Sequence, residues 1–270
     1  MKLENKNVVV TGGAGGIGAA MCRLFAQQVA NVLVSDLNLE AAQEVANEIG
    51  GFAVQCDVSN ESAVQSLVKQ AEDHFGHVDL FCSNAGFGVG EPGHAASASN
   101  DVWQKNWDVH VMAHVYASRA LLPKMIERGS GYLMSTASAA GLLSQIGDAA
   151  YTVTKHAAVA FAESLAITHG DDGIKVSVLC PQYVNTNILM ISDEQRAKPM
   201  PGVLSAEECA QCVLEAIENE VFLITPHPEV RDYMMHRASD SDRWIGGMQR
   251  YRKTLIDEDG KMNFAKIFDK

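Results

Sequence analysis

The sequence has no long apolar segment and fewer basic than acidic residues. No run of about 18 or more apolar residues occurs, so no membrane-spanning helix is expected. Lys and Arg number 21 against 33 Asp and Glu, and the formal net charge of -12 disfavours nucleic acid and anionic membranes as partners. Residues 1–6 lack the layout of a signal peptide, so we expect a cytoplasmic protein.

The sequence also lacks a recognisable metal-binding pattern. Most of its six cysteines fall within apolar runs, which is typical of reduced thiols in the core of a cytoplasmic protein. Cys209 and Cys212 form a CxxC pair, but no second pair of Cys or His lies nearby. Helix packing is therefore favoured over zinc, and no metal site is expected. No repeat or internal boundary divides the chain, so we expect one domain over residues 1–270.

A glycine-rich turn follows the first apolar run. Residues 7–10 are predicted to form a buried strand, residues 11–18 read TGGAGGIG, and a helix pattern follows over residues 19–28. Such a turn lets a pyrophosphate approach the backbone and the first N–H groups of the helix. The residues predicted to contact a dinucleotide here are Gly12, Gly15, Gly16 and Ile17. The helix then ends at residues 28–30 without a glycine for a left-handed cap, which predicts a small cost in stability.

A carboxylate closes the second predicted strand, at residues 31–35. Asp36 lies 18 residues beyond Gly18, where it can bind ribose hydroxyls and would repel a 2′-phosphate. Leu37 follows, and the glycine turn holds no Arg or Lys to pair with such a phosphate, so NAD is favoured over NADP as the cofactor. The alternative role of Asp36 is to cap the next helix, and both roles can hold in one loop.

Strand and helix patterns alternate along the chain. We predict strands at residues 7–10, 31–35, 52–56, 78–82, 132–135, 174–180 and 221–224, and helices at residues 19–28, 39–49, 61–75, 101–127, 151–170 and 205–219. This alternation predicts an α/β fold, a doubly wound parallel sheet (Rossmann fold) of seven strands with helices on both faces. Ligands bind at the carboxyl ends of such strands, where Asp36, Asp57 and Asn84 fall.

A tyrosine and a lysine lie four residues apart at the start of the helix predicted at residues 151–170. This spacing puts Tyr151 and Lys155 on one helix face, where the ammonium favours the phenolate and lowers the tyrosine pKa from about 10. Tyr151 could then exchange a proton with an alcohol or a ketone. Ser138 follows a predicted strand and can donate to the substrate oxygen. Spacing favours Ser138, although Ser135 and Ser144 offer the same chemistry.

Five motifs occur in an order that closely resembles the classical short-chain dehydrogenase/reductase family. They are TGGAGGIG, Asp57-Val58, Asn84-Ala85-Gly86, Ser138 and Tyr151-xxx-Lys155, and the resemblance covers about residues 5–225. It implies an oxidoreductase in which Tyr151 is the acid/base and Ser138 holds the substrate oxygen. It implies that Lys155 binds the nicotinamide ribose and lowers the tyrosine pKa. A homotetramer built on the helices at residues 101–127 and 151–170 is also implied, with a homodimer as the alternative.

The same resemblance implies further contacts to the cofactor. Asp57 and Val58 are expected at the adenine, and residues 84–86 are expected to stabilise the central strand beside the cofactor. Val184 and Thr186 are expected at the nicotinamide carboxamide.

Two positions depart from the family pattern. His110 stands where the family usually has an Asn that helps to hold a water next to the active-site lysine. A neutral imidazole also has one donor and one acceptor and could titrate near neutral pH, so we hypothesise that His110 sustains a proton relay. The alternative is a packed histidine with impaired catalysis around it. Gln182 replaces the usual glycine after Pro181, and the sequence leaves its role open between fixing the loop and placing a polar group near the substrate.

The predicted substrate pocket is mostly apolar, which favours a small hydrophobic alcohol or ketone. The residues expected to contact the substrate are Phe87, Ser138, Leu143, Tyr151, Tyr183 and Met190. Residues 187–204 are interpreted as a substrate lid. Residues 226–270 are interpreted as a helical C-terminal extension that covers the pocket or packs across a subunit interface, with its arginines facing solvent or a neighbouring subunit. The leading function is an NAD-dependent dehydrogenase of a hydrophobic secondary alcohol, and the alternative is a catalytically impaired NAD-binding sensor or scaffold.

Overall fold

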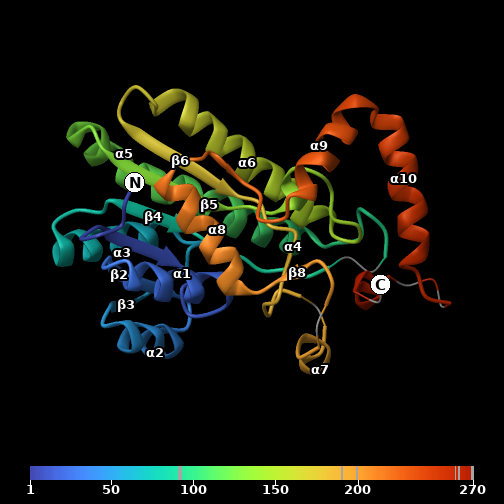
Figure 1. The fold of residues 1–270 in the computed structure, drawn as a ribbon, viewed down its shortest axis with the longest axis horizontal. Helices are drawn as coiled ribbons and strands as arrows, with labels where there is room; N and C mark the ends of the chain where they lie inside the picture. Colours follow the sequence, from blue (N-terminus) through green and yellow to red (C-terminus); the bar gives the residue numbers. More distant parts are fainter. Residues whose placement is uncertain (91–92, 190, 199, 259, 261, 269–270) are drawn as a thin grey trace.

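A parallel sheet of seven strands forms the centre of the molecule (Figure 1). The computed structural model describes residues 1–90, 93–189, 191–198, 200–258, 260 and 262–268. The strands lie in the order β3-β2-β1-β4-β5-β6-β9. Their bounds are β1 (Asn7–Thr11), β2 (Asn31–Asp36), β3 (Phe52–Gln55), β4 (Leu80–Ser83), β5 (Gly131–Thr136), β6 (Ile174–Leu179) and β9 (Leu223–Ile224). The predicted doubly wound fold with seven strands is confirmed.

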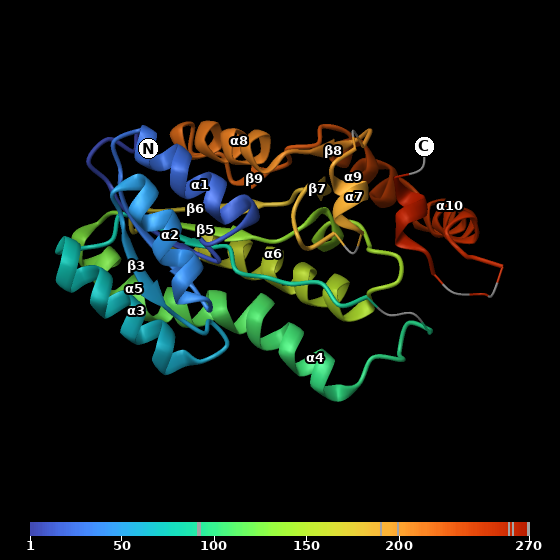
Figure 2. The same ribbon diagram turned by 90° about the horizontal axis from the view of Figure 1, so that it is seen from below.

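Helices cover both faces of this sheet, as Figure 2 shows. One apolar cluster joins the sheet to α1 (Gly16–Gln27), α2 (Leu39–Ile49) and α8 (Ala206–Glu218). A second cluster joins the other face to α3 (Glu61–Phe75), α5 (Ala113–Arg128) and α6 (Ala149–His169). In β1, Val8 and Val10 belong to the first cluster and Val9 to the second, because alternate side chains of a strand point to opposite faces. No described helix is long and apolar enough to cross a membrane.

The single helix predicted at residues 101–127 is interrupted in the structure. It consists of α4 (Asn100–Trp107), a π-helical turn at Asp108–Met112, and α5. A π-helical turn widens the helix by one residue and is frequent at functional sites. An amphipathic pattern does not distinguish this turn from a regular α-helix, so sequence periodicity could not predict it. His110 lies within the turn.

The end of α1 has the irregular geometry that its sequence indicates. Val29 adopts a φ of 62°, in the left-handed region that a β-branched residue rarely occupies. The N–H groups of Gln28 and Val29 still donate to carbonyls of the last helical turn, so the strain lies in the backbone dihedral and not in lost hydrogen bonds. The predicted absence of a glycine cap is therefore visible as strain at Val29.

The segment after β6 leaves the sheet. β7 (Tyr183–Val184) and β8 (Val203–Leu204) form a separate two-stranded parallel pair, and α7 (Asp193–Arg196) lies between them. This segment contains the region interpreted as a lid, and its movement stays a prediction.

The last part of the chain forms two helices that project beyond the sheet (Figure 1). They are α9 (Glu229–Ser239) and α10 (Ser241–Thr254), and a short 3-10 helix follows at Phe264–Ile267. Asp240 joins the two helices and caps α10, because its carboxylate accepts the N–H of Arg243 at 2.9 Å. We call residues 229–268 the C-terminal arch. Most of its arginines, including Arg231, are exposed. Arg231 and Arg237 also donate to backbone carbonyls of the main body, which the sequence interpretation did not foresee.

Candidate active site

The glycine turn between β1 and α1 is closely packed. Gly12 and Gly16 have φ angles of +63° and +50°, which favour glycine. A Cβ on Gly18 would lie 2.0 Å from the carbonyl oxygen of Gly12, so only glycine fits there. A Cβ on Gly15, by contrast, would have no heavy atom within 4 Å. The turn thus packs against itself on one side and leaves open space at the N-terminus of α1 on the other, where a phosphate group fits.

The carboxylate of Asp36 lies beside this turn. Its Oδ2 accepts the N–H of Ala14 at 3.2 Å and its Oδ1 accepts the N–H of Asn38 at 3.1 Å. Asn38, not Asp36, is the N-cap of α2, since its side chain accepts the N–H of Ala41 at 3.2 Å. The capping role considered for Asp36 therefore belongs to Asn38, and Asp36 lines the groove beside the glycine turn.

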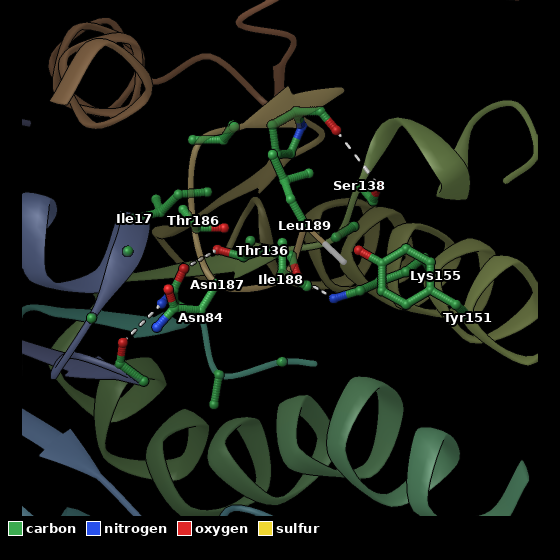
Figure 3. Close-up of a pocket in the computed structure, with 18 of the residues that line it drawn as sticks. Ile17, Asn84, Thr136, Ser138, Tyr151, Lys155, Thr186, Asn187, Ile188 and Leu189 are labelled. Atoms are coloured by element: carbon green, nitrogen blue, oxygen red, sulfur yellow. Dashed lines mark hydrogen bonds between the residues drawn. The ribbon is translucent and has the colours of Figure 1, made fainter. Parts of the chain in front are cut away.

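Asn84 connects three neighbouring strands at their carboxyl ends. Its amide nitrogen donates to the carbonyl of Thr11 at the end of β1, at 3.1 Å. Its amide oxygen accepts the hydroxyl of Thr136 at the end of β5, at 3.0 Å. Asn84 itself follows β4, so one side chain holds the three strand ends in register. Figure 3 shows the hydrogen bond between Asn84 and Thr136.

A groove of about 280 Å³ runs from the glycine turn to the start of α6. Predicted residues that line it are Gly12, Gly15, Gly16, Ile17, Asp36, Asn84, Ser138, Tyr151, Lys155, Val184 and Thr186. Leu37, Asp57 and Val58 do not line it, although they follow β2 and β3 at the same edge of the sheet. Asp57 instead accepts hydrogen bonds from the N–H and the hydroxyl of Ser59. The adenine contacts implied for Asp57 and Val58 stay a prediction.

Ser138 and Tyr151 lie on the side of the groove opposite Ile17 and Thr186 (Figure 3). Ser138 is buried and begins a short 3-10 helix, where its Oγ accepts the N–H of Ala140 at 3.1 Å. Tyr151 lies in the first turn of α6, and its N–H donates to the N-cap Asp148 at 3.0 Å. Ser138 and Tyr151 also line a second, mostly apolar cavity, so these two side chains lie where the groove meets that cavity.

Lys155 is buried one turn after Tyr151. Its ammonium donates to the carbonyl of Thr136 at 3.0 Å and lies 5.5 Å from the centre of the Tyr151 ring. Burial lowers the pKa of Lys155 to about 8. Burial also raises the pKa of Tyr151 to about 12, although a hydrogen bond with Ser138 opposes the increase. The expected lowering of the tyrosine pKa is thus not found in the protein chain itself, because desolvation outweighs the hydrogen bond with Ser138.

The profile of the short chain dehydrogenase family matches residues 6–197. The chain belongs to this family. A 1-deoxy-11-beta-hydroxypentalenate dehydrogenase of Streptomyces exfoliatus is 33% identical over 253 residues, which are 91% of each chain. A cyclohexanol dehydrogenase of Acinetobacter sp. (strain SE19) is 30% identical over 239 residues, 86% of this chain and 95% of that relative. The crystal structure of a short chain dehydrogenase/reductase from Burkholderia phymatum in complex with NAD has a TM-score of 0.80 and 28% identity, covering 90% of this chain and 96% of that one.

In this short-chain dehydrogenase, His110 is held as a neutral imidazole. Its Nε2 accepts the N–H of Phe87 at 3.2 Å, so the proton resides on Nδ1, which lies 3.3 Å from the hydroxyl of Thr154. Burial, with the charge of Lys155 as a smaller cause, lowers the pKa of His110 well below its usual 6.5. The expectation that His110 titrates near neutral pH is therefore wrong.

The ring of His110 lies between two residues of the site. It is 4.8 Å from the ring of Phe87 and meets the ring of Tyr151 edge-on at 5.4 Å. His110 therefore connects the loop after β4 to the first turn of α6. Phe87 packs here and does not line the cavities beside Ser138, so its predicted contact with substrate stays untested.

The other predicted substrate residues are placed as follows. Tyr183 lines the apolar cavity with Ser138 and Tyr151, and Leu143 lines the cavity next to it. Met190 lies outside the described residues. Among the described residues no group of three His, Cys, Asp or Glu side chains could hold a metal ion. Cys209 is buried in the apolar cluster around α8, and Cys212 packs against that cluster.

His227 is a residue that the sequence interpretation missed. It is buried, its Nδ1 accepts the N–H of Gln182 at 3.1 Å, and its Nε2 lies 3.1 Å from the carbonyl of Tyr183. This imidazole fixes the loop that leads from β6 to Val184. The two prolines that flank His227 mark a break in the chain, but the sequence carries no signal for a partner about 45 residues away.

Proposed function

We propose that this short-chain dehydrogenase is an NAD-dependent oxidoreductase that interconverts a hydrophobic secondary alcohol and its ketone. The observation that carries the proposal is the position of Ser138 and Tyr151, which line both the groove and the apolar cavity. A substrate oxygen between these hydroxyls would have its carbinol carbon facing the groove and its carbon skeleton in the cavity.

The groove fits NAD in shape and charge. The space beside Gly15 and the N-terminus of α1 accept a pyrophosphate, and the carboxylate of Asp36 accepts ribose hydroxyls. No Lys or Arg other than Lys155 lines the groove among the described residues, so a 2′-phosphate would meet Asp36 without a cation to offset it. The NAD bound to the Burkholderia phymatum relative supports the same choice. When bound, NAD supplies the hydride acceptor for alcohol oxidation.

Tyr151 is the proposed proton donor and acceptor. With a pKa raised to about 12, its hydroxyl is protonated at neutral pH and can donate to the oxygen of a ketone. In the direction of alcohol oxidation, the positive charge of Lys155 favours the phenolate that must form, and Lys155 keeps this charge below about pH 8. Ser138 holds the substrate oxygen. His110 acts as a positioning residue, since both of its nitrogens are occupied and its ring contacts that of Tyr151.

The Tyr151→Phe variant tests this proposal. It removes the hydroxyl and keeps the ring, so turnover should fall about 10²–10⁴-fold while NADH binding changes little. The measurement is NADH fluorescence, first with NAD and a panel of cyclic, aromatic and aliphatic secondary alcohols, then by titration with NADH. Tyr116→Phe, on α5 and outside the cavities beside Ser138, is the matched control. Substantial turnover by Tyr151→Phe would place the acid/base elsewhere.

The alternative function is a binding protein, a sensor or scaffold that binds NAD without catalysis. This alternative rests on His110, which stands where the family usually has an Asn. A wild-type protein that binds NADH but forms none from a broad alcohol panel would favour this alternative.

We also propose that the protein assembles as a homotetramer or homodimer through α4, α5 and α6. Apolar side chains are exposed on these helices, at Trp107, Ile126, Val153 and Ile167. Cytoplasmic location and the absence of nucleic acid and membrane partners stay predictions from the composition.

A further inference from the structure

Residues of the C-terminal arch line a large cavity next to the proposed active site. This cavity has a volume of about 330 Å³. Its walls come from the turn after β5, from the loop after β6 and from the arch. The lining residues that the arch contributes are Tyr233, Trp244, Met248, Tyr251, Leu255 and Ile267. We call this cavity the aromatic chamber, because Tyr183 faces it as well.

The chamber adjoins the smaller apolar cavity that Tyr151 lines. That cavity measures about 100 Å³, and Ile267 and Phe268 of the arch line it. The two cavities share lining residues, namely Ser138, Gln145, Gln182, Tyr183 and Ile267. A molecule whose oxygen lies at Ser138 and Tyr151 can therefore extend past Gln182 into the chamber.

The first helix of the arch is fastened to the main body. Arg231 donates to the carbonyl of Leu223 at 2.9 Å, and Arg237 donates to the carbonyl of Leu142. Between them, Val230 is fully buried and packs with Leu143. These contacts give α9 a defined position over the turn after β5, so the chamber has a fixed wall.

The tail after α10 returns to the site through its own hydrogen bonds. The N–H of Asn263 donates to the carbonyl of Leu255 at 2.9 Å, and the ammonium of Lys266 donates to the carbonyl of Ile256 at 2.9 Å. The ring of Phe268 then meets the ring of Tyr183 edge-on at 5.1 Å. The arch thus contributes residues to the walls of both cavities.

The chemistry of the chamber selects for uncharged, bulky groups. No Lys, Arg, His, Asp or Glu lines it among the described residues, so a carboxylate or phosphate would be buried without a partner. Flat aromatic walls favour ring systems. At the junction, Oε1 of Gln182 is buried without a hydrogen-bond partner in the described part of the chain, so it can accept a hydroxyl of the substrate.

We infer that the arch determines specificity, and that the substrate is an uncharged secondary alcohol or ketone with two or more fused rings. The ring that carries the oxygen lies beside Tyr151, and the remaining rings fill the aromatic chamber. This inference rests on the proposed oxidoreductase function.

Two methionines of the arch provide a matched test. Met248 on α10 lines the chamber, whereas Met235 on α9 is exposed and does not. Met248→Trp fills the chamber, so kcat/KM for decahydro-2-naphthol and for a steroid alcohol should fall about 10-fold more than kcat/KM for cyclohexanol. Met235→Trp should leave all three values unchanged. An equal loss for the one-ring and multi-ring alcohols, or an equal effect of the two variants, would overturn the inference.

A binding measurement separates this inference from the proposed function. Trp244 lines the chamber, so the steroid alcohol should quench its fluorescence in the presence or absence of turnover. Trp244→Phe should remove this quenching and keep the emission of Trp103 and Trp107. Quenching without turnover would overturn the proposed function and support the chamber. Turnover of multi-ring alcohols without quenching of Trp244 would support the proposed function and overturn the inference about the chamber.

Discussion

The glycine turn and the C-terminal arch line the same site but are built in different ways. In the turn, atoms of Gly12 and Gly18 approach so closely that no Cβ fits, and α1 buries six residues against the sheet. In the arch, α10 buries no residue fully, and α9 is held by two arginines and one buried valine. The turn holds the cofactor, whose position must be fixed for hydride transfer. The arch has only to exclude water and to provide apolar lining for the substrate cavity.

This contrast predicts different tolerance to substitution. Gly18→Ala should have the largest effect, since its Cβ would lie 2.0 Å from a backbone oxygen. We expect a loss of about 3 kcal/mol or more in the free energy of unfolding, a fall in Tm of roughly 6–12 °C. Gly15→Ala is the matched control, because its Cβ meets nothing within 4 Å and its φ of -156° suits any residue. Thermal unfolding without cofactor measures both, and equal Tm values for the two variants would contradict the packing argument.

Asp36→Ala tests how the groove beside the glycine turn distinguishes NAD from NADP. Removing a charged acceptor from the ribose should weaken NAD binding by about 10–100-fold. NADP should lose far less, because the repulsion of its 2′-phosphate is removed as well. Titration of protein fluorescence gives both Kd values. Asp57→Ala, outside the groove, tests whether the implied adenine contact exists: a similar loss of NAD affinity would restore Asp57 to the site.

Buried His114 should make the free energy of unfolding sensitive to acid, whereas the exposed residues of the arch should contribute little to this sensitivity. His114 on α5 is buried with no hydrogen-bond partner for either ring nitrogen in the described part of the chain, and burial lowers its pKa to about 3. Between pH 6.5 and 3 the unfolded state binds more protons than the folded state, so the free energy of unfolding falls as the pH falls, by about 1.4 kcal/mol per unit for each such histidine.

His114→Leu should remove its share of this loss, about 2 kcal/mol between pH 6.5 and 5. Unfolding in urea at pH 7 and pH 5 gives the difference. His236→Gln, at an exposed position of the arch, should keep the wild-type dependence. If His114→Leu also keeps it, the acid sensitivity comes from other groups.

Val29→Gly should produce the smallest effect, and it is stabilising. Glycine relieves the positive φ of 62°, and the side chain of Val29 is too exposed to lose much packing. We expect a gain of about 1 kcal/mol, a rise in Tm of roughly 2–4 °C. Val29→Ala keeps a Cβ and should gain less. A lower Tm for Val29→Gly would mean that the greater freedom of glycine in the unfolded chain outweighs the relieved strain.

Much of the fold and of the cofactor side could be predicted from local pattern. Strands alternate with helices, and each βα unit buries both faces of its strand, so periodicity alone predicts the parallel sheet. The π-helical turn at residues 108–112 could not be predicted, because the same apolar pattern fits an unbroken helix. The protonation state of His110 depends on hydrogen bonds with Phe87 and Thr154, which lie 23 and 44 residues away in the sequence. No local sequence motif could therefore predict it.

The glycine turn, the carboxylate at the end of β2 and the one-turn spacing of Tyr151 and Lys155 follow from the amino-acid sequence alone. Each of these depends on backbone geometry within a single turn or on one helix face, which neighbouring residues dictate. The protonation of the site and the shape of the substrate cavity depend on tertiary structure. Burial raises the pKa of Tyr151 and lowers that of Lys155, and the chamber joins Ser138 to Ile267. Desolvation and cavity shape are collective properties of segments far apart in the chain, so they arise only when the chain has folded.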